Sequence, residues 1–135
     1  MTLDNLVKIR ELKQQPPSQQ EYDVLLKAGS ERLEDAKNMS LSYASRFDLA
    51  YNASHSFALA VLRASGYRRD KRYLVFQCLA HTTDLNRATT RIFSLCHDKH
   101  NLAEYEGHFE EGEALLRQLI TSCVELKRVV KQLSL

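Results

Sequence analysis

The sequence predicts an all-α fold, an up-and-down antiparallel bundle of four main helices with short extra helices. Apolar residues recur at helical spacing along most of the 135 residues, and hydrophobic residues make up 44% of the chain. Only four glycines and two prolines are present, which is too few for the frequent turns of an all-β protein. We expect one domain over 1–135, with a short helix and a proline-containing linker in 1–17 and the bundle in 18–135.

The first two predicted helices are separated by prolines. Residues 2–14 predict a short helix, and Pro16-Pro17 end it because proline cannot continue a helix. The second helix is predicted over 18–38, and Gly29-Ser30 form a weak point at which it can kink.

Four further helices follow. One is predicted over 41–65, and Gly66 suits the C-terminal cap of that helix. The pattern over 71–83 is less regular, as in a helix buried on most sides, and the next helix covers 86–107. The last, over 111–133, has acids in its first turn and bases in its last turns, which suits the helix dipole. The short connections favour antiparallel neighbours.

The three cysteines, Cys78, Cys96 and Cys123, lie far apart among apolar residues. We expect them to be buried thiols in a reducing compartment rather than a disulfide framework or a zinc site. No apolar run approaches the roughly 18 residues that a membrane span needs. Charged residues also interrupt the N-terminal stretch where a signal peptide would be apolar. A cytoplasmic protein without a membrane contact is therefore predicted.

Charge is concentrated in two segments. Residues 63–72 contain five bases and one acid, whereas 104–113 contain five acids and no lysine or arginine. The basic segment has three interpretations: a solvated connector, a contact with phosphate or nucleic acid, or a partner of the acidic segment within the chain or across a dimer. The candidate nucleic-acid-binding residues are Arg63, Arg68, Arg69, Lys71 and Arg72.

A polar cluster lies near the end of the predicted helix over 86–107. His97, His100, Glu104 and His108 stand at i, i+3, i+7 and i+11, on one face of a continuous helix. Imidazoles and carboxylates bind zinc or iron, but only neighbouring pairs of this set, such as His100 and Glu104, can reach one ion. We expect no metal and no other cofactor.

Three stretches carry a resemblance to a known family. Residues 51–67 begin Tyr-Asn-Ala-Ser-His, residues 73–82 read Tyr-Leu-Val-Phe-Gln-Cys-Leu-Ala-His-Thr, and residues 101–106 read Asn-Leu-Ala-Glu-Tyr-Glu. Together they resemble the HEPN domains of prokaryotes, in particular small stand-alone members with an Asn-x-Ala-Glu-Tyr motif. The resemblance covers most of 40–130 and implies a helical bundle that is usually dimeric. Such domains include metal-independent ribonucleases of toxin–antitoxin or phage-defence systems and non-catalytic companions of nucleotidyltransferases.

The ribonuclease motif of that family is altered in this sequence. The family has an arginine, often followed by asparagine, and a histidine a few residues later. Here His100 takes the place of the arginine, Asn101 follows it, and Glu104 and Tyr105 occupy the place of the histidine. Cleaving RNA through its 2′-hydroxyl needs a base for that proton and a cation for the phosphorane. His100 can serve partly as either because it titrates near neutral pH, whereas Tyr105 is a weak base and Glu104 repels phosphate.

We therefore expect a homodimeric HEPN-like module that binds nucleic acid, nucleotide or a partner protein, such as a nucleotidyltransferase or an antitoxin, with weak or no catalysis. The alternative is a metal-independent endoribonuclease toxin. The candidate catalytic residues are His100, Asn101, Glu104 and Tyr105. Asn101 is the expected organiser because its amide can fix a neighbouring side chain. In a two-fold dimer the two copies of this group can face one another.

Overall fold

The computed structural model describes residues 3–8, 12–69, 71–106 and 112–133, without the side chains of Lys8 and 102–106. Within these residues the chain forms six helices and one two-stranded sheet, and the predicted all-α bundle is confirmed. The helices are α1 (Leu3–Lys8), α2 (Gln19–Ala36), α3 (Tyr43–Ala64), α4 (Arg72–Thr82), α5 (Arg87–Glu106) and α6 (Glu113–Lys131), and the strands are β1 (Lys13–Gln14) and β2 (Tyr67–Arg68).

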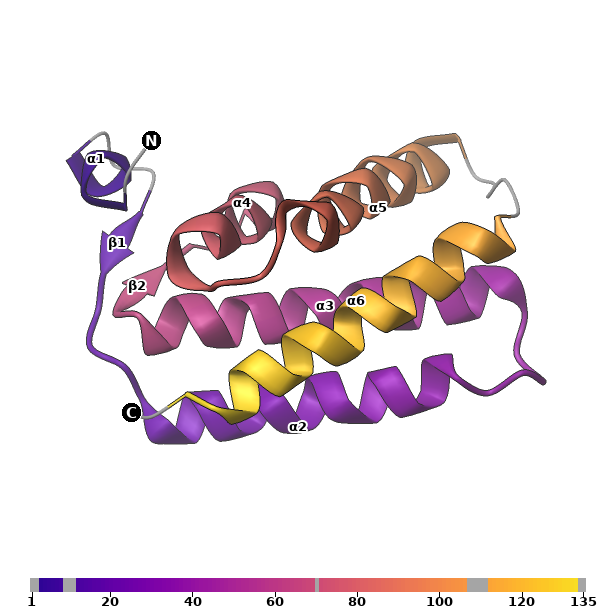
Figure 1. Cartoon of the computed structure of the whole chain (residues 1–135), viewed down its shortest axis with the longest axis horizontal. Helices are drawn as coiled ribbons and strands as arrows, with labels where there is room; N and C mark the ends of the chain where they lie inside the picture. Colours follow the sequence, from indigo (N-terminus) through magenta and orange to yellow (C-terminus); the bar gives the residue numbers. More distant parts are fainter. Residues whose placement is uncertain (1–2, 9–11, 70, 107–111, 134–135) are drawn as a thin grey trace.

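Helix α3 lies in the middle of the bundle. It contacts α2, α4, α5 and α6, and Figure 1 shows α2 on one side of it, α4 and α5 on the other, and α6 crossing diagonally. Its alanines at 50, 53, 58 and 60 are completely buried. Because an alanine adds only a methyl group, the neighbouring helices pack close to the α3 backbone. Side chains on α3 are therefore held on a rigid support.

Local contacts form both ends of α3. Ser42 Oγ accepts a hydrogen bond from Ser45 N at 3.1 Å, and this bond caps the N-terminus. Just past the C-terminus, Gly66 has a φ of 92°, in the left-handed region that favours glycine. Gly66 thus has the predicted capping role, and it turns the chain into β2.

Helix α2 runs as one helix from Gln19 to Ala36, through the Gly29-Ser30 pair that the sequence marks as a weak point. The glycine serves packing instead. A Cβ added at Gly29 would lie 2.6 Å from Cε1 of Phe57 on α3, a distance that real contacts do not reach. The missing side chain therefore makes room for the Phe57 ring.

The helix predicted over 2–14 does not extend over that whole range, because the described part of α1 covers Leu3–Lys8 and residues 13–14 form β1. The strand register pairs Lys13 with Arg68 and Gln14 with Tyr67. Gln15 N also donates to Gly66 O at 2.9 Å. These bonds to a distant segment replace the helical ones, and Pro16 disfavours helical backbone at the residue before it.

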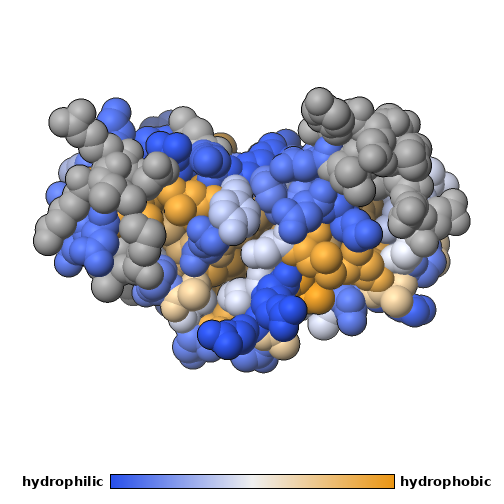
Figure 2. Space-filling view, turned by 90° about the horizontal axis from the view of Figure 1, so that it is seen from above, coloured by the Kyte–Doolittle hydropathy of each residue, from blue (hydrophilic) through white to orange (hydrophobic). Residues whose placement is uncertain are grey.

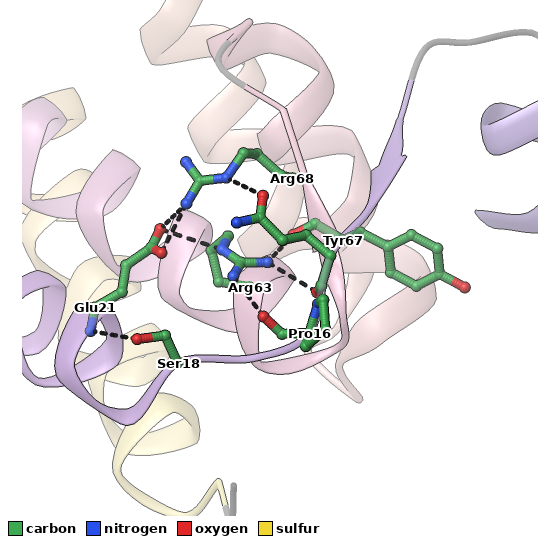
Figure 3. A network of polar contacts seen from close by, with 7 residues as sticks. Pro16, Ser18, Glu21, Arg63, Tyr67 and Arg68 are labelled. Atoms are coloured by element: carbon green, nitrogen blue, oxygen red, sulfur yellow. Dashed lines mark hydrogen bonds and ion pairs between the residues drawn. The ribbon is translucent and has the colours of Figure 1, made fainter.

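A buried guanidinium ties this N-terminal segment to the bundle, as Figure 3 shows. Arg63 is 2% exposed, and its Nη1 donates to the carbonyl oxygens of Gln15 and Tyr67, both at 3.2 Å. Its Nη2 donates to Pro16 O at 2.8 Å, and its Nε donates to Glu21 Oε1 at 3.1 Å. A charge can be buried only when it is paired and hydrogen-bonded, and Arg63 meets both conditions.

The three cysteines are buried, as the sequence predicts. Burial raises the pKa of Cys78 to about 11 and the pKa values of Cys96 and Cys123 to about 12. Their thiols are therefore protonated near neutral pH and act as small core side chains.

The outer surface is mixed in character. Figure 2 shows apolar patches separated by hydrophilic residues on the face that it displays. Val24, Leu95 and Val124 are among the exposed large apolar side chains. In the described part of the chain, none of the helices is both long and apolar enough to span a bilayer.

Candidate functional site

Three helices enclose a polar hollow beside Tyr51, which we call the Tyr51 hollow. It has a volume of about 380 Å³. Its walls are Asp48, Tyr51 and Asn52 from α3, Arg72 from α4, and His100 and Asn101 from α5. Residues three or four apart lie on one side of a helix, so the α3 residues reach the hollow together. Arg72 is the first residue of α4 and also lines the hollow.

A chain of hydrogen bonds joins α3 to α5 through His97. Tyr51 Oη and His97 Nδ1 share a hydrogen bond at 2.8 Å. The other ring nitrogen, His97 Nε2, lies 3.1 Å from Asn101 Nδ2. When the Asn101 amide donates to Nε2, the neutral ring carries its proton on Nδ1 and donates it to Tyr51 Oη.

The electrostatic surroundings of His97 favour this neutral ring. Burial is the largest effect and lowers the pKa of His97 below its usual 6.5. Asp98 opposes this shift, whereas His100 and Arg72 add to it. A neutral His97 in the folded protein near pH 7 follows, consistent with the hydrogen bonds that its two nitrogens make.

His100 is more deeply buried than His97, and its hydrogen-bond partner is Asp48. It is 4% exposed, and its Nε2 lies 2.8 Å from Asp48 Oδ1. Its ring stacks on Tyr51, with centroids 4.2 Å apart and planes 18° from parallel. Asp48 and Tyr51 therefore fix both the position and the orientation of the His100 ring.

Arg72 lies over the ring of the same tyrosine. Its Cζ lies 5.4 Å from the centroid of the Tyr51 ring, within the range of a cation–π contact. Among the described residues, no carboxylate lies within ion-pair distance of this guanidinium. The guanidinium of Arg72 therefore lines a polar hollow without an ion pair to a described carboxylate.

The arrangement suits an anionic ligand. Arg72 supplies a positive charge, and the Asn52 and Asn101 side chains supply amide groups at the same hollow. Guanidinium and amide N–H groups are the donors that proteins use to hold phosphate oxygens. Within the described ranges, no group of three or more His, Cys, Asp or Glu side chains is placed to hold a metal ion.

No family model matches the chain, and no curated protein or solved structure is significantly similar to it.

The structure brings His100 and Asn101 to the hollow, as two of the four candidate catalytic residues. Glu104 and Tyr105 belong to the backbone of α5, but their side chains lie outside the described residues. Of the four residues considered for a metal, the Glu104 side chain and the whole of His108 lie outside the described residues.

The five candidate nucleic-acid-binding bases lie in different places. Arg63 is buried, and Arg68 Nη2 binds both carboxylate oxygens of Glu21 at 2.6 Å (Figure 3). Lys71 is exposed immediately before α4, and Arg69 is partly buried. The first two arginines therefore join the N-terminal segment to the bundle, and Arg72 alone of the five lines the Tyr51 hollow.

Sequence reasoning missed Asp48, Tyr51 and Asn52 as site residues. A tyrosine at helical spacing among apolar residues is typical of a core position, and Tyr51 is indeed only 1% exposed. The signal that could have found this side of the site is the polar pair Asp48 and Asn52, which stand four residues apart and so lie on one side of α3, next to Tyr51.

Proposed function

We propose that this chain is a HEPN-like module that binds a phosphate-bearing ligand, RNA or a nucleotide, at the Tyr51 hollow with little or no catalysis. One observation carries the proposal. Arg72 lies over the Tyr51 ring at a polar hollow, and no described carboxylate lies within ion-pair distance of it. An arginine fixed in this way is preorganised for a phosphate, because less side-chain freedom is lost on binding.

The rest of the hollow supports the same chemistry. Asn52 and Asn101 line the same hollow as the arginine. Each amide nitrogen already makes one hydrogen bond, to Asp48 O and His97 Nε2, and its second N–H can donate to phosphate or to the edge of a base. Among the described residues of the lining, Asp48 is the only carboxylate, and its Oδ1 already pairs with His100 Nε2. The Asp48 side chain is 52% exposed, and its hydrogen bond with His100 offsets part of the repulsion that its carboxylate exerts on a phosphate.

The proposal includes a cytoplasmic, prokaryotic setting and a homodimer. A nucleotidyltransferase or an antitoxin is the proposed second partner, as the HEPN resemblance implies. The exposed apolar side chains Leu95 on α5 and Val124 on α6 support self-association, because symmetric pairing is the commonest way to cover such surface.

Binding is tested by fluorescence anisotropy with a labelled single-stranded RNA and, separately, with AMP. Arg72→Gln should weaken RNA binding severalfold because one phosphate contact is lost. The slope of log K against log salt should also become less steep, by about 0.7 for that one contact.

Arg32→Gln is the matched control, because Arg32 is exposed on α2 and lies outside the hollow. It removes the same charge and should leave the affinity unchanged. Equal losses in the two variants would mean that net charge alone attracts RNA and would contradict the proposal. AMP binding without RNA binding would assign the hollow to a nucleotide.

The second candidate function, a metal-independent endoribonuclease, is favoured by the Asp48–His100 pair. A carboxylate that orients an imidazole is the arrangement that general bases use. If the chain cleaves RNA, cleavage should persist in EDTA, and Asp48→Asn and His100→Gln should each abolish it while circular dichroism stays unchanged. RNA that stays intact with the wild-type protein would eliminate this candidate and leave the binding proposal in place.

A further inference from the structure

A second hollow lies at the N-terminal half of α5, between α4, α5 and α1. It has a volume of about 410 Å³, and we call it the Arg91 hollow. Its apolar part includes Leu74 and Ala80, and its polar part includes Gln77, Arg87, Arg91 and Ser94. We infer that this hollow is a second phosphate subsite for the same single-stranded RNA, which runs along α5. The inference rests on the function proposed above.

The charge of the Arg91 hollow supports an anionic ligand. Arg87 and Arg91 stand four residues apart on α5, so their side chains lie one turn apart on the same side. Both are exposed, and neither has an ion-pair partner among the described residues. Two guanidinium groups at one hollow provide the paired donors that phosphate contacts use.

The two hollows lie in series along one helix. Thr90 and Ser94 line the Arg91 hollow, Asn101 lines the Tyr51 hollow, and His97 binds Asn101. These four residues stand at i, i+4, i+7 and i+11, which places them on one side of α5. At 1.5 Å per residue the path from Thr90 to Asn101 is about 16 Å long. A path of this length suits a strand of at least about four nucleotides.

An exposed aromatic side chain connects the hollows. Tyr73 is 41% exposed, and its ring centroid lies 5.8 Å from that of His97. Its hydroxyl accepts a hydrogen bond at 2.8 Å from Gln77 Nε2, and Gln77 belongs to the Arg91 hollow. Exposed tyrosines between basic positions are the stacking platforms of single-strand-binding surfaces. Paired bases of a duplex are stacked on one another and do not reach such a ring, so the ligand is single-stranded.

The test compares two RNA lengths. A single-stranded RNA of about eight nucleotides covers both hollows, whereas a dinucleotide reaches only one. Arg87→Gln/Arg91→Gln should weaken binding of the longer RNA about tenfold and reduce its salt slope by about 1.4, for two lost phosphate contacts. Binding of the dinucleotide at the Tyr51 hollow should not change.

The control is Arg32→Gln/Arg117→Gln, which removes the same charge from exposed positions on α2 and α6. It should leave both affinities as they are. Tyr73→Ala should weaken binding of the longer RNA at least about fivefold, whereas Tyr73→Phe, which keeps the ring, should not.

The outcomes separate this inference from the proposed function. Wild-type affinity for the longer RNA in the double variant would overturn the inference while leaving the Tyr51 hollow as the RNA site. Equal weakening of the dinucleotide and the longer RNA would also overturn it, because the Arg91 hollow would then not be a separate subsite. A wild-type protein that binds AMP but neither RNA would overturn the inference and leave the Tyr51 hollow as a nucleotide site. A wild-type protein that binds neither RNA nor AMP would overturn the proposed function, and the inference with it.

Discussion

At the scale of single residues, burial decides how His97 behaves. Its two ring nitrogens are occupied by Tyr51 and Asn101, and its pKa is lowered mainly by burial. The unfolded chain, in which the ring is hydrated, binds its proton more readily than the folded protein does. Folding and proton binding therefore oppose one another at this residue.

We predict a pH dependence of stability from this residue. The stabilising contribution is complete above pH 6.5, the usual histidine value. It is lost as the pH falls from 6.5 toward the lowered pKa of the folded state, because only the unfolded state takes up the proton in that interval. The free energy of unfolding measured in urea should therefore fall more between neutral and mildly acidic pH for wild type than for His97→Gln. Parallel pH profiles of the two proteins would contradict this.

Residue patterns predicted part of the site. His100 and Asn101 were named as candidates because they lie in a polar cluster near the end of the predicted helix over 86–107 and because the HEPN resemblance places its altered motif there. The role of Arg63 was not found, because a buried arginine and a solvated one look the same in a basic segment. Its burial depends on carbonyl groups of Gln15 and Pro16, which lie almost fifty residues away.

At the scale of secondary-structure elements, the four long helices were predicted within a few residues, because their apolar stripes and caps are local signals. The exception is the N-terminal segment, where β1 exists only because β2 offers it backbone partners. A two-residue strand of this kind has no pattern of its own. No window of local sequence could have predicted it.

The contact between α2 and α3 gives a prediction about Gly29. Alanine favours helix over glycine by about 1 kcal/mol, so Gly29→Ala should stabilise an isolated helix. In the bundle the added methyl group meets the Phe57 ring, and we expect a net loss of about 1–3 kcal/mol in the free energy of unfolding. Urea denaturation followed by circular dichroism measures it.

Two further variants control this measurement. Ser30→Ala changes the next residue of α2, which no such contact constrains, and should stay within about 0.5 kcal/mol of wild type. Gly29→Ala/Phe57→Leu should lose less than the sum of its single changes, because the smaller side chain makes room for the methyl group. Additive losses would show that the ring contact is not the cause.

At the scale of the whole molecule, composition and periodicity predicted the bundle, because a chain with six apolar-striped segments must bury those stripes together. The location of the Tyr51 hollow did not follow in the same way. It depends on α3, α4 and α5 meeting at one point, and residues from 48 to 101 contribute to it. Such a meeting point is a property of tertiary packing.

The proposed homodimer gives a prediction at this scale. Light scattering at tens of micromolar protein should give twice the mass of the 15.5 kDa chain. Val124→Lys, which places a charge on an exposed apolar position of α6, should shift the mass toward that of the monomer. Val24→Lys on α2 is the matched change and should leave the dimer intact. A monomeric wild type would contradict the prediction.

The central position of α3 has a consequence for the divergence of this protein. Helix α3 touches four other helices, and its alanines are completely buried against them. A larger side chain at one of these alanines would clash with a neighbouring helix. A larger side chain there must be matched by a smaller one on a second helix. In a lineage that keeps this bundle, replacements in α3 will therefore arise as compensated pairs. The outer faces of α2 and α6 can accumulate single, independent replacements.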